Sequence, residues 1–136
     1  MRMLLIIVLS FVAVALAAET APAPGYTLAS LHDAAGVAEL PAEPVISCRL
    51  DGDRIGGKGP VNNWFGGLVV AGETRSVAKG PIGATMMMGP ENLMALEQRF
   101  MRALEAIQEQ PIVVTDGGMT MRSADGSVTM QWTLAP

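Results

Sequence analysis

The chain has 136 residues, of which 50% are hydrophobic, and it carries 13 acidic against 9 basic side chains, a formal net charge of −4. This length suits one compact domain and leaves no room for two. Basic residues form no cluster along the chain, which argues against nucleic acid or anionic lipid as the partner, because both require a positive face.

The first segment has the pattern of an export signal. Arg2 precedes an almost uninterrupted apolar stretch from Met3 to Ala18, and Ala15 and Ala17 have the spacing that a signal peptidase recognises. The stretch is shorter than the roughly 20 apolar residues of a membrane-spanning helix, and no cysteine follows it for a lipid anchor. We expect residues 1–17 to be a cleaved signal peptide and the protein to be periplasmic or secreted, without membrane insertion after cleavage. An uncleaved anchor is the alternative.

Residues 18–25 are rich in proline and alanine and are predicted to form an extended tether ahead of one domain at 26–136. Short strands are predicted at 27–32 and 44–50. Residues 51–67 contain so many glycines that we expect tight turns and a bulged strand.

Within this glycine-rich segment we expect Trp64 and Phe65 to be the only large side chains that are buried. Residues 68–78 are predicted to form a hairpin that turns at 71–73. Cys48, which is the only cysteine, occupies an alternating apolar position, so a buried, inert thiol is favoured over a redox or intermolecular role.

The clearest helical pattern begins at Pro90, which suits the first helical position, and Glu91 favours the positive end of the helix dipole. Apolar side chains then recur at three- and four-residue steps and form one stripe, which consists of Leu93, Leu96, Phe100, Leu104 and Ile107. Two turn signals, at 116–118 and 125–126, separate three further strands. We therefore predict an α+β fold in which a curved, mostly antiparallel sheet of about seven to eight short strands wraps around one amphipathic helix at about 90–109.

The methionine run in ATMMMGPENLM, residues 84–94, raises the question of a soft-metal site, because thioether sulfur suits Cu(I). The candidate ligands are Met86, Met88 and Met94. If residues 85–88 form a strand, Met86 and Met88 face one side and Met87 faces the other. The three consecutive methionines then cannot converge on one ion. Core packing is therefore the favoured role of these methionines, and no metal or cofactor is expected.

No arrangement of residues indicates catalysis. His32 and Asp33 could act as a base and its orienting group, but no serine lies in a nucleophile-elbow context, and a surface histidine in a loop is the favoured interpretation. Asp51 and Asp53 resemble part of a calcium loop, yet the distal glutamate is missing and a hairpin turn fits better. We expect a protein that is not an enzyme.

Two stretches, GGKGPVNNWFGG at 56–67 and GATMMMGPENLMALEQRFMRAL at 83–104, carry a pattern that resembles the paired motifs of the META domain. This family, also called HslJ-like, comprises small bacterial envelope and exported proteins. The matching positions are Gly59, Asn63, Phe65 and Gly67 in the first motif, and Thr85, Met87, Glu97, Phe100 and Leu104 in the second. The resemblance extends over 26–134.

The resemblance implies no catalytic residue and no ligand, so the matching residues are interpreted structurally. Asn63 would supply a turn hydrogen bond, and Phe65 and Phe100 would pack in the core. Relatives often have cysteine where this chain has Asn62 and Gly89, which implies that these two positions lie close together.

The leading hypothesis is an exported, non-enzymatic META-domain protein with a binding, stress-tolerance or envelope-maintenance role and an envelope or extracellular protein as partner. One alternative is periplasmic copper binding through methionine. Another is inhibition of an extracellular hydrolase through a rigid exposed loop, at 35–44 or 59–63.

Overall fold

A computed structural model describes residues 23–136; the predicted signal peptide and most of the predicted tether lie outside the described residues. The elements are β1 (Gly25–Asp33), β2 (Gly36–Val37), β3 (Ser47–Asp51), β4 (Arg54–Lys58), β5 (Asn63–Ala71), β6 (Thr74–Val77), β7 (Gly83–Ala84), α2 (Glu91–Ala106), β8 (Val113–Thr115), β9 (Gly118–Arg122) and β10 (Thr129–Leu134). No helix within 23–136 has the length and apolar character needed to cross a membrane.

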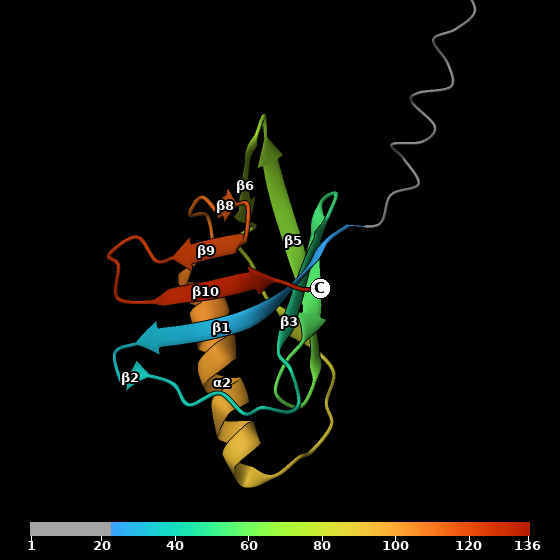
Figure 1. Cartoon of the computed structure of the whole chain (residues 1–136), viewed down its shortest axis with the longest axis vertical. Helices are drawn as coiled ribbons and strands as arrows, with labels where there is room; N and C mark the ends of the chain where they lie inside the picture. The colour runs from blue at the N-terminus through green and yellow to red at the C-terminus, as the bar shows by residue number, and fades with distance from the viewer. Residues whose placement is uncertain (1–22) are drawn as a thin grey trace, which may run out of the picture.

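The strands form one antiparallel sheet in the order β6-β5-β4-β3-β1-β10-β9-β8, with the two-residue strands β2 and β7 attached to β1 and β5. β1 and β10 are paired along most of their length, so the first and last strands of the domain lie side by side at the centre of the sheet (Figure 1). The sheet curls into a half-barrel with α2 on its concave side. The predicted α+β fold, a curved antiparallel sheet around one helix, is confirmed.

Backbone hydrogen bonds join β6, which is one edge of this curled sheet, to the segment between α2 and β8. On the β6 side, the Arg75 carbonyl accepts from Ile112 N at 2.8 Å and the Val77 carbonyl accepts from Glu109 N at 2.8 Å. The segment after α2 thus covers part of the edge of β6 before it continues into β8. A covered edge matters because an open row of backbone donors and acceptors invites pairing with other chains.

The helix supplies the centre of the core. Leu96, Phe100, Leu104 and Ile107 of the predicted stripe are buried, whereas Leu93, nearer the start of the helix, is only half-buried. The Phe100 ring meets the indoles of Trp64 and Trp132 edge to face, with centroid separations of 5.6 and 6.2 Å. Such edge-to-face contacts add to the free energy of burial. The apolar periodicity of α2 therefore predicted its inward face correctly.

Turn chemistry also placed the hairpins correctly. Gly72 and Gly126 adopt φ of +65° and +77° in the β5–β6 and β9–β10 turns, a conformation that glycine adopts without steric cost. The glycine-rich segment 51–67 holds the β3–β4 turn, β4 and the start of β5, but its register is unbroken. The register shift lies in β1, between Leu28 and Ser30, so the expected bulge in 51–67 is wrong.

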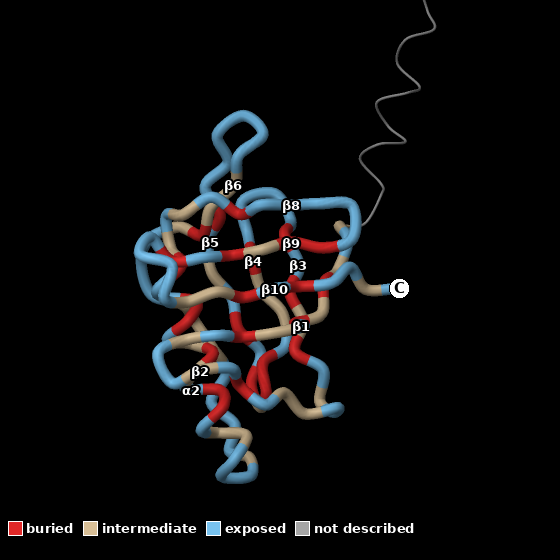
Figure 2. The backbone as a smooth tube through the Cα atoms, turned by 60° about the vertical axis from the view of Figure 1, so that its left-hand side comes forward, coloured by how far each residue is buried: buried red, intermediate tan, exposed pale blue. Residues whose placement is uncertain are grey.

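The β5–β6 hairpin extends beyond the rest of the sheet, and its tip is exposed on both strands (Figure 2). Val69 and Val70, which are adjacent in β5, are both exposed there. The opposite end of the molecule holds the start of α2 and the loop that leads into it from β7. A buried polar cluster formed by Asn62 and Glu97 lies against that loop.

Candidate functional site

Glu97, in the second turn of α2, is a buried carboxylate with a full set of donors. Its Oε1 accepts from the backbone N–H of Val61 at 2.9 Å and of Asn62 at 2.6 Å, and its Oε2 accepts from Asn62 Nδ2 at 2.7 Å. It lies three residues before Phe100 on the inward face of the helix. Burying a carboxylate is costly unless hydrogen bonds replace its hydration, and the loop between β4 and β5 supplies them.

Asn62 extends this cluster to the loop before α2. Its Oδ1 accepts from Met87 N at 2.6 Å and from Thr85 Oγ1 at 2.9 Å, while its Nδ2 also donates to the Met87 carbonyl at 3.1 Å. The carboxamide therefore pairs with the backbone of Met87 as a neighbouring strand would. Thr85 Oγ1 in turn accepts from Asn63 N at 3.1 Å.

These residues tie three segments together: the β4–β5 loop, the β7–α2 loop and the helix. We call Asn62, Thr85, Met87 and Glu97 the Asn62 cluster. All its buried side-chain polar atoms have partners; among the described residues the buried side-chain atom without one is Trp132 Nε1. A fully satisfied buried network fixes one arrangement of its segments.

Gly59 makes room for the cluster. Its N–H donates to the Asn62 carbonyl at 2.8 Å in the tight turn between β4 and β5. A Cβ atom on Gly59 would lie 2.9 Å from that carbonyl oxygen and 3.1 Å from Glu97 Oε1. A side chain at this position would push the loop away from the carboxylate, which explains the glycine in physical terms.

The structure brings four of the motif positions together at this cluster: Gly59, Thr85, Met87 and Glu97. The backbone of Asn63 adjoins the cluster through two hydrogen bonds with Thr85. The remaining motif positions are Phe65, Gly67, Phe100 and Leu104. Phe100 and Leu104 are fully buried, as predicted. The side-chain hydrogen bonds at the turn come from Asn62 and not from Asn63, so the role expected for Asn63 is wrong.

Phe65 also departs from the prediction, because its side chain is 56% exposed. On β5 the buried positions are Trp64 and Leu68, and the alternation of the strand turns Phe65 to the outer face. Its ring covers Gly83 of β7, where a Cβ atom would come 2.1 Å from Phe65 Cε2. Adjacent strand residues cannot both face the core, and Trp64 occupies the inward position.

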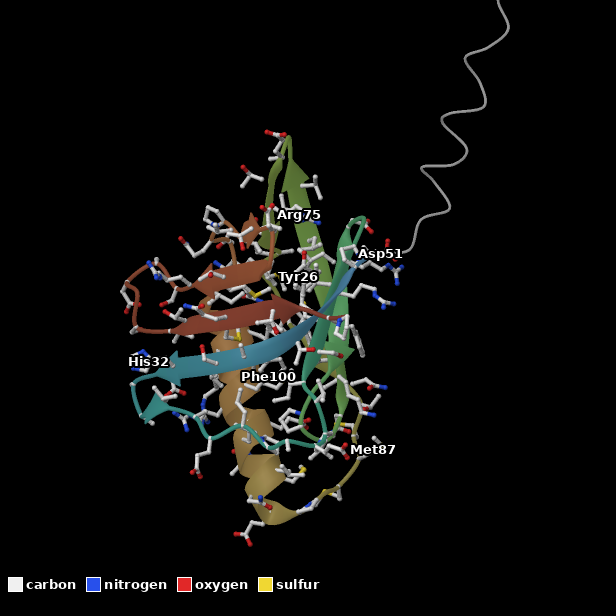
Figure 3. The ribbon with its side chains drawn as sticks, viewed as in Figure 1. Tyr26, His32, Asp51, Arg75, Met87 and Phe100 are labelled. Atoms are coloured by element: carbon white, nitrogen blue, oxygen red, sulfur yellow. The ribbon has the colours of Figure 1, made fainter. Side chains whose placement is uncertain are left out.

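The expectation that the methionine run packs in the core is wrong. Met86, Met87 and Met88 are all exposed, because β7 ends at Ala84 and the following residues form a loop. Figure 3 shows Met87 on this loop, well away from Phe100 in the core. Met94, on α2, is half-buried. The methionines of the last two strands do pack in the core; they are Met119, Met121 and Met130.

The family resemblance implies that Asn62 and Gly89 lie close together, and the two loops that carry these residues are in contact. Asn62 binds the backbone of Met87, and a Cβ atom on Gly89 would lie 2.9 Å from Val61 Cγ2. In this chain the side-chain carboxamide of Asn62 links the two loops through its hydrogen bonds to Met87. Cys48 lies apart from this contact, buried in β3, and burial raises the pKa of its thiol above the ordinary value.

A second polar link joins α2 to the β1–β2 turn. Arg99 Nε donates to Asp33 Oδ2 at 2.7 Å, and Arg99 Nη2 donates to Asp33 Oδ1 at 2.8 Å and to the Gly36 carbonyl at 2.7 Å. The guanidinium lowers the pKa of Asp33 through these hydrogen bonds. Asp33 is therefore engaged by Arg99, and His32 is an exposed residue near the end of β1 rather than in a loop (Figure 3).

The two loops considered for hydrolase inhibition differ in exposure. Residues 59–63 are mostly buried, and their backbone donors serve Glu97, so a projecting inhibitory loop at 59–63 is wrong. Residues 35–44 carry exposed side chains such as Val37 and Glu39, but Ala38 is buried. Asp51 ends β3 and Asp53 lies in the two-residue turn before β4, as the turn interpretation predicts.

A curled antiparallel sheet around one helix, with a buried asparagine–glutamate cluster that links two loops to the helix, defines a small α+β domain. The sequence model of the META domain matches residues 21–135. The chain therefore belongs to the META-domain family, and the resemblance seen in its two motifs is confirmed.

Solved structures with the same fold support the architecture. The chain is similar to a protein from Burkholderia xenovorans whose structure was determined by NMR, with a TM-score of 0.66 and 17% identity over 88% of this chain and 87% of that chain. It is also similar to a second NMR structure, with a TM-score of 0.55 and 15% identity over 85% of this chain and 92% of the other. No curated protein matches the sequence. At these identities the likeness concerns the fold alone.

Sequence reasoning missed the role of Asn62 and the burial of Glu97. The signal for Glu97 was present, because an acidic residue three positions before Phe100 falls on the apolar face of the helix. A buried acid on such a face requires donors from another segment. No local signal identified Asn62 as their source.

Proposed function

We propose that this META-domain protein is exported from the cytoplasm and acts in the cell envelope or outside the cell by binding a protein partner, without catalysis. Export is supported by the sequence of residues 1–17, in which the cationic Arg2 is followed by an apolar run. Binding is supported by the geometry of the β7–α2 loop.

The observation that carries the proposal is a firmly held loop with exposed methionines. Asn62 fixes the Met87 backbone through its N–H and its carbonyl, and the loop leads directly into α2. Met86, Met87 and Met88 nevertheless turn their side chains to solvent. Exposed, unbranched thioether side chains on a fixed backbone suit contact with an apolar protein surface, because methionine adapts its shape to its partner.

The polar groups of the Asn62 cluster serve the architecture in this proposal. Both oxygens of Glu97 and both polar atoms of the Asn62 side chain are occupied by partners within the domain. A catalytic acid or base must instead have an atom free to reach substrate. The cluster therefore favours a role in positioning the loop.

The binding proposal is tested by comparative capture from envelope extract with the purified protein as bait. The variant Met86→Ser/Met87→Ser/Met88→Ser removes the thioethers, and Val69→Ser/Val70→Ser, on the distant β5–β6 hairpin, is the matched control. We expect a partner that the wild type and the hairpin variant retain and the methionine variant loses. Equal retention by all three proteins would move the contact away from this loop.

Export is tested separately by fractionation of cells that express the full chain. We expect the protein in the periplasm or the medium, with an N-terminus close to Ala18. A chain found in the cytoplasm with Met1 and Arg2 still attached would contradict this part of the proposal.

A second candidate function is soft-metal binding. The sequence favoured core packing for the methionine run, but the run is exposed, and this exposure favours metal binding. Met86, Met87 and Met88 are accessible to an incoming ion, whereas methionines packed in the core are not. Titration with Cu(I) or Ag(I) should show saturable binding that the triple serine variant loses. An absence of binding to the wild type ends this candidate.

A further inference from the structure

The eight methionines of the described residues differ in their exposure to solvent: three are exposed, three are buried and two are half-buried. Met86, Met87 and Met88 are 94%, 55% and 86% exposed, whereas Met119, Met121 and Met130 are 2%, 1% and 0% exposed. Met94 and Met101, on α2, are half-buried. One small domain thus presents three thioethers to solvent and encloses three others in its core.

We propose that Met86, Met87 and Met88 form a modification site for oxidants that transfer an oxygen atom, such as hypochlorous acid. Oxidation of methionine depends on access to the sulfur, so the exposed run reacts before the core methionines do. Met86 and Met88 are the first to react and Met87 follows. This inference does not depend on the proposed binding role.

The accessibility of the run is fixed by the Asn62 cluster. Asn62 holds the Met87 N–H and carbonyl, and Thr85 N donates to the Asn63 carbonyl at 3.0 Å, so the backbone on the N-terminal side is anchored. On the C-terminal side the run leads directly into α2, and the loop contacts the β4–β5 loop there, because a Cβ atom on Gly89 would lie 2.9 Å from Val61 Cγ2. The backbone is therefore held on both sides of the run while the methionine side chains lie in solvent.

The chemistry balances without a cofactor. A lone pair of the thioether sulfur attacks the oxygen of hypochlorous acid, an S–O bond forms, and the O–Cl bond breaks. Chloride and a proton leave, so the sulfur loses two electrons and the chlorine gains them. The product is methionine sulfoxide, in which a polar S=O group replaces an apolar sulfur.

The position of the run decides what this product does to the fold. A sulfoxide at Met86 or Met88 remains in water, where its oxygen is hydrated. A sulfoxide at Met121 or Met130 would place a strong acceptor in the core without a donor, which is costly. Oxidation of the exposed run therefore leaves the domain folded and consumes oxidant before the core methionines are damaged.

The experiment treats the purified protein with limiting hypochlorous acid and follows each methionine by peptide mass spectrometry. We expect Met86 and Met88 to gain oxygen at least about tenfold faster than Met119, Met121 and Met130, while tryptophan fluorescence and circular dichroism stay unchanged. In guanidinium chloride the rates should become similar, which would assign the selectivity to the fold. Equal rates in the folded protein, or loss of structure when only the exposed run is oxidised, would overturn the proposal.

A matched pair of variants identifies the site. Met86→Leu/Met87→Leu/Met88→Leu should lose the early oxygen uptake and oxidise its core methionines at a lower oxidant dose than the wild type. Met94→Leu/Met101→Leu should retain the early uptake. Unchanged early uptake in the triple variant would show that the oxidant reacts elsewhere.

Discussion

Substitution of Asn62 by alanine tests the central claim that one carboxamide links two loops to the helix. The substitution removes four side-chain hydrogen bonds: one to Glu97, two to the Met87 backbone and one from the Thr85 hydroxyl. The alanine backbone keeps its own N–H bond to Glu97 Oε1. Oε2 of Glu97 is left without its donor inside the domain.

The magnitude follows from the kinds of bond that are lost. A hydrogen bond to a charged group contributes about 1.5–3 kcal/mol to the free energy of unfolding and a neutral one about 0.5–1.5 kcal/mol. Bonds made by one side chain are not additive, and Thr85 lies at the exposed surface, where water replaces its partner. We therefore expect Asn62→Ala to lower the free energy of unfolding by about 3 kcal/mol.

Guanidinium chloride unfolding, followed by the fluorescence of the buried Trp64 and Trp132, measures this loss. Asn63→Ala is the matched control, because the neighbouring side chain is exposed, and it should cost less than about 0.5 kcal/mol. Asn62→Asp should cost more than Asn62→Ala, since it places a second carboxylate against Glu97. A loss below about 1 kcal/mol in Asn62→Ala, or one equal to that of the control, would refute the reasoning.

Three further predictions concern the core, the Arg99–Asp33 ion pair and the turn between β9 and β10, in which Asp125 accepts hydrogen bonds from Ser127. Phe100→Ala should lower the free energy of unfolding by about 3–5 kcal/mol, measured in the same assay, because it empties the space between two indoles; a loss of about 1 kcal/mol would contradict the packing. Arg99→Gln should cost about 1 kcal/mol at neutral pH. Because the pKa of Asp33 is lowered in the folded state, this contribution is present above the unfolded pKa and is lost as the pH falls through the folded pKa, so the difference between the two proteins should shrink in acid. Hydrogen bonds from Ser127, first from its backbone and then from its hydroxyl, hold the pKa of Asp125 at about 2. An NMR titration of Ser127→Ala should show this pKa raised but still below the ordinary aspartate value. An unchanged pKa would exclude the hydroxyl as a cause.

The family resemblance identified positions that meet in the structure, but it led to wrong roles for two residues, Asn63 and Phe65. Three of the positions that it marked, Gly59, Thr85 and Glu97, meet at one cluster in the structure. It assigned the turn hydrogen bond to Asn63 and a core position to Phe65, and both assignments are wrong. In each case the adjacent residue has the inward position, which a motif alone does not reveal.

The sequence by itself determined the features that depend on local periodicity and turn chemistry. The apolar stripe from Leu96 to Ile107 fixed the inward face of the helix, and the glycines at 72 and 126 fixed two hairpin turns. Each of these signals lies within a few residues along the chain, where helix and strand geometry relate spacing to direction.

Only the tertiary structure decided which loops meet and what they bury. Asn62 and Glu97 are 35 residues apart, and Asn62 and Met87 are 25 apart, so their pairing depends on how the whole sheet curls around the helix. The same folding leaves Met86, Met87 and Met88 in solvent. The loop backbone at Met87 is hydrogen-bonded by the Asn62 side chain, in the place that a neighbouring strand would otherwise take. Burial of a residue in a loop is a property of its partners, and local sequence does not specify those partners.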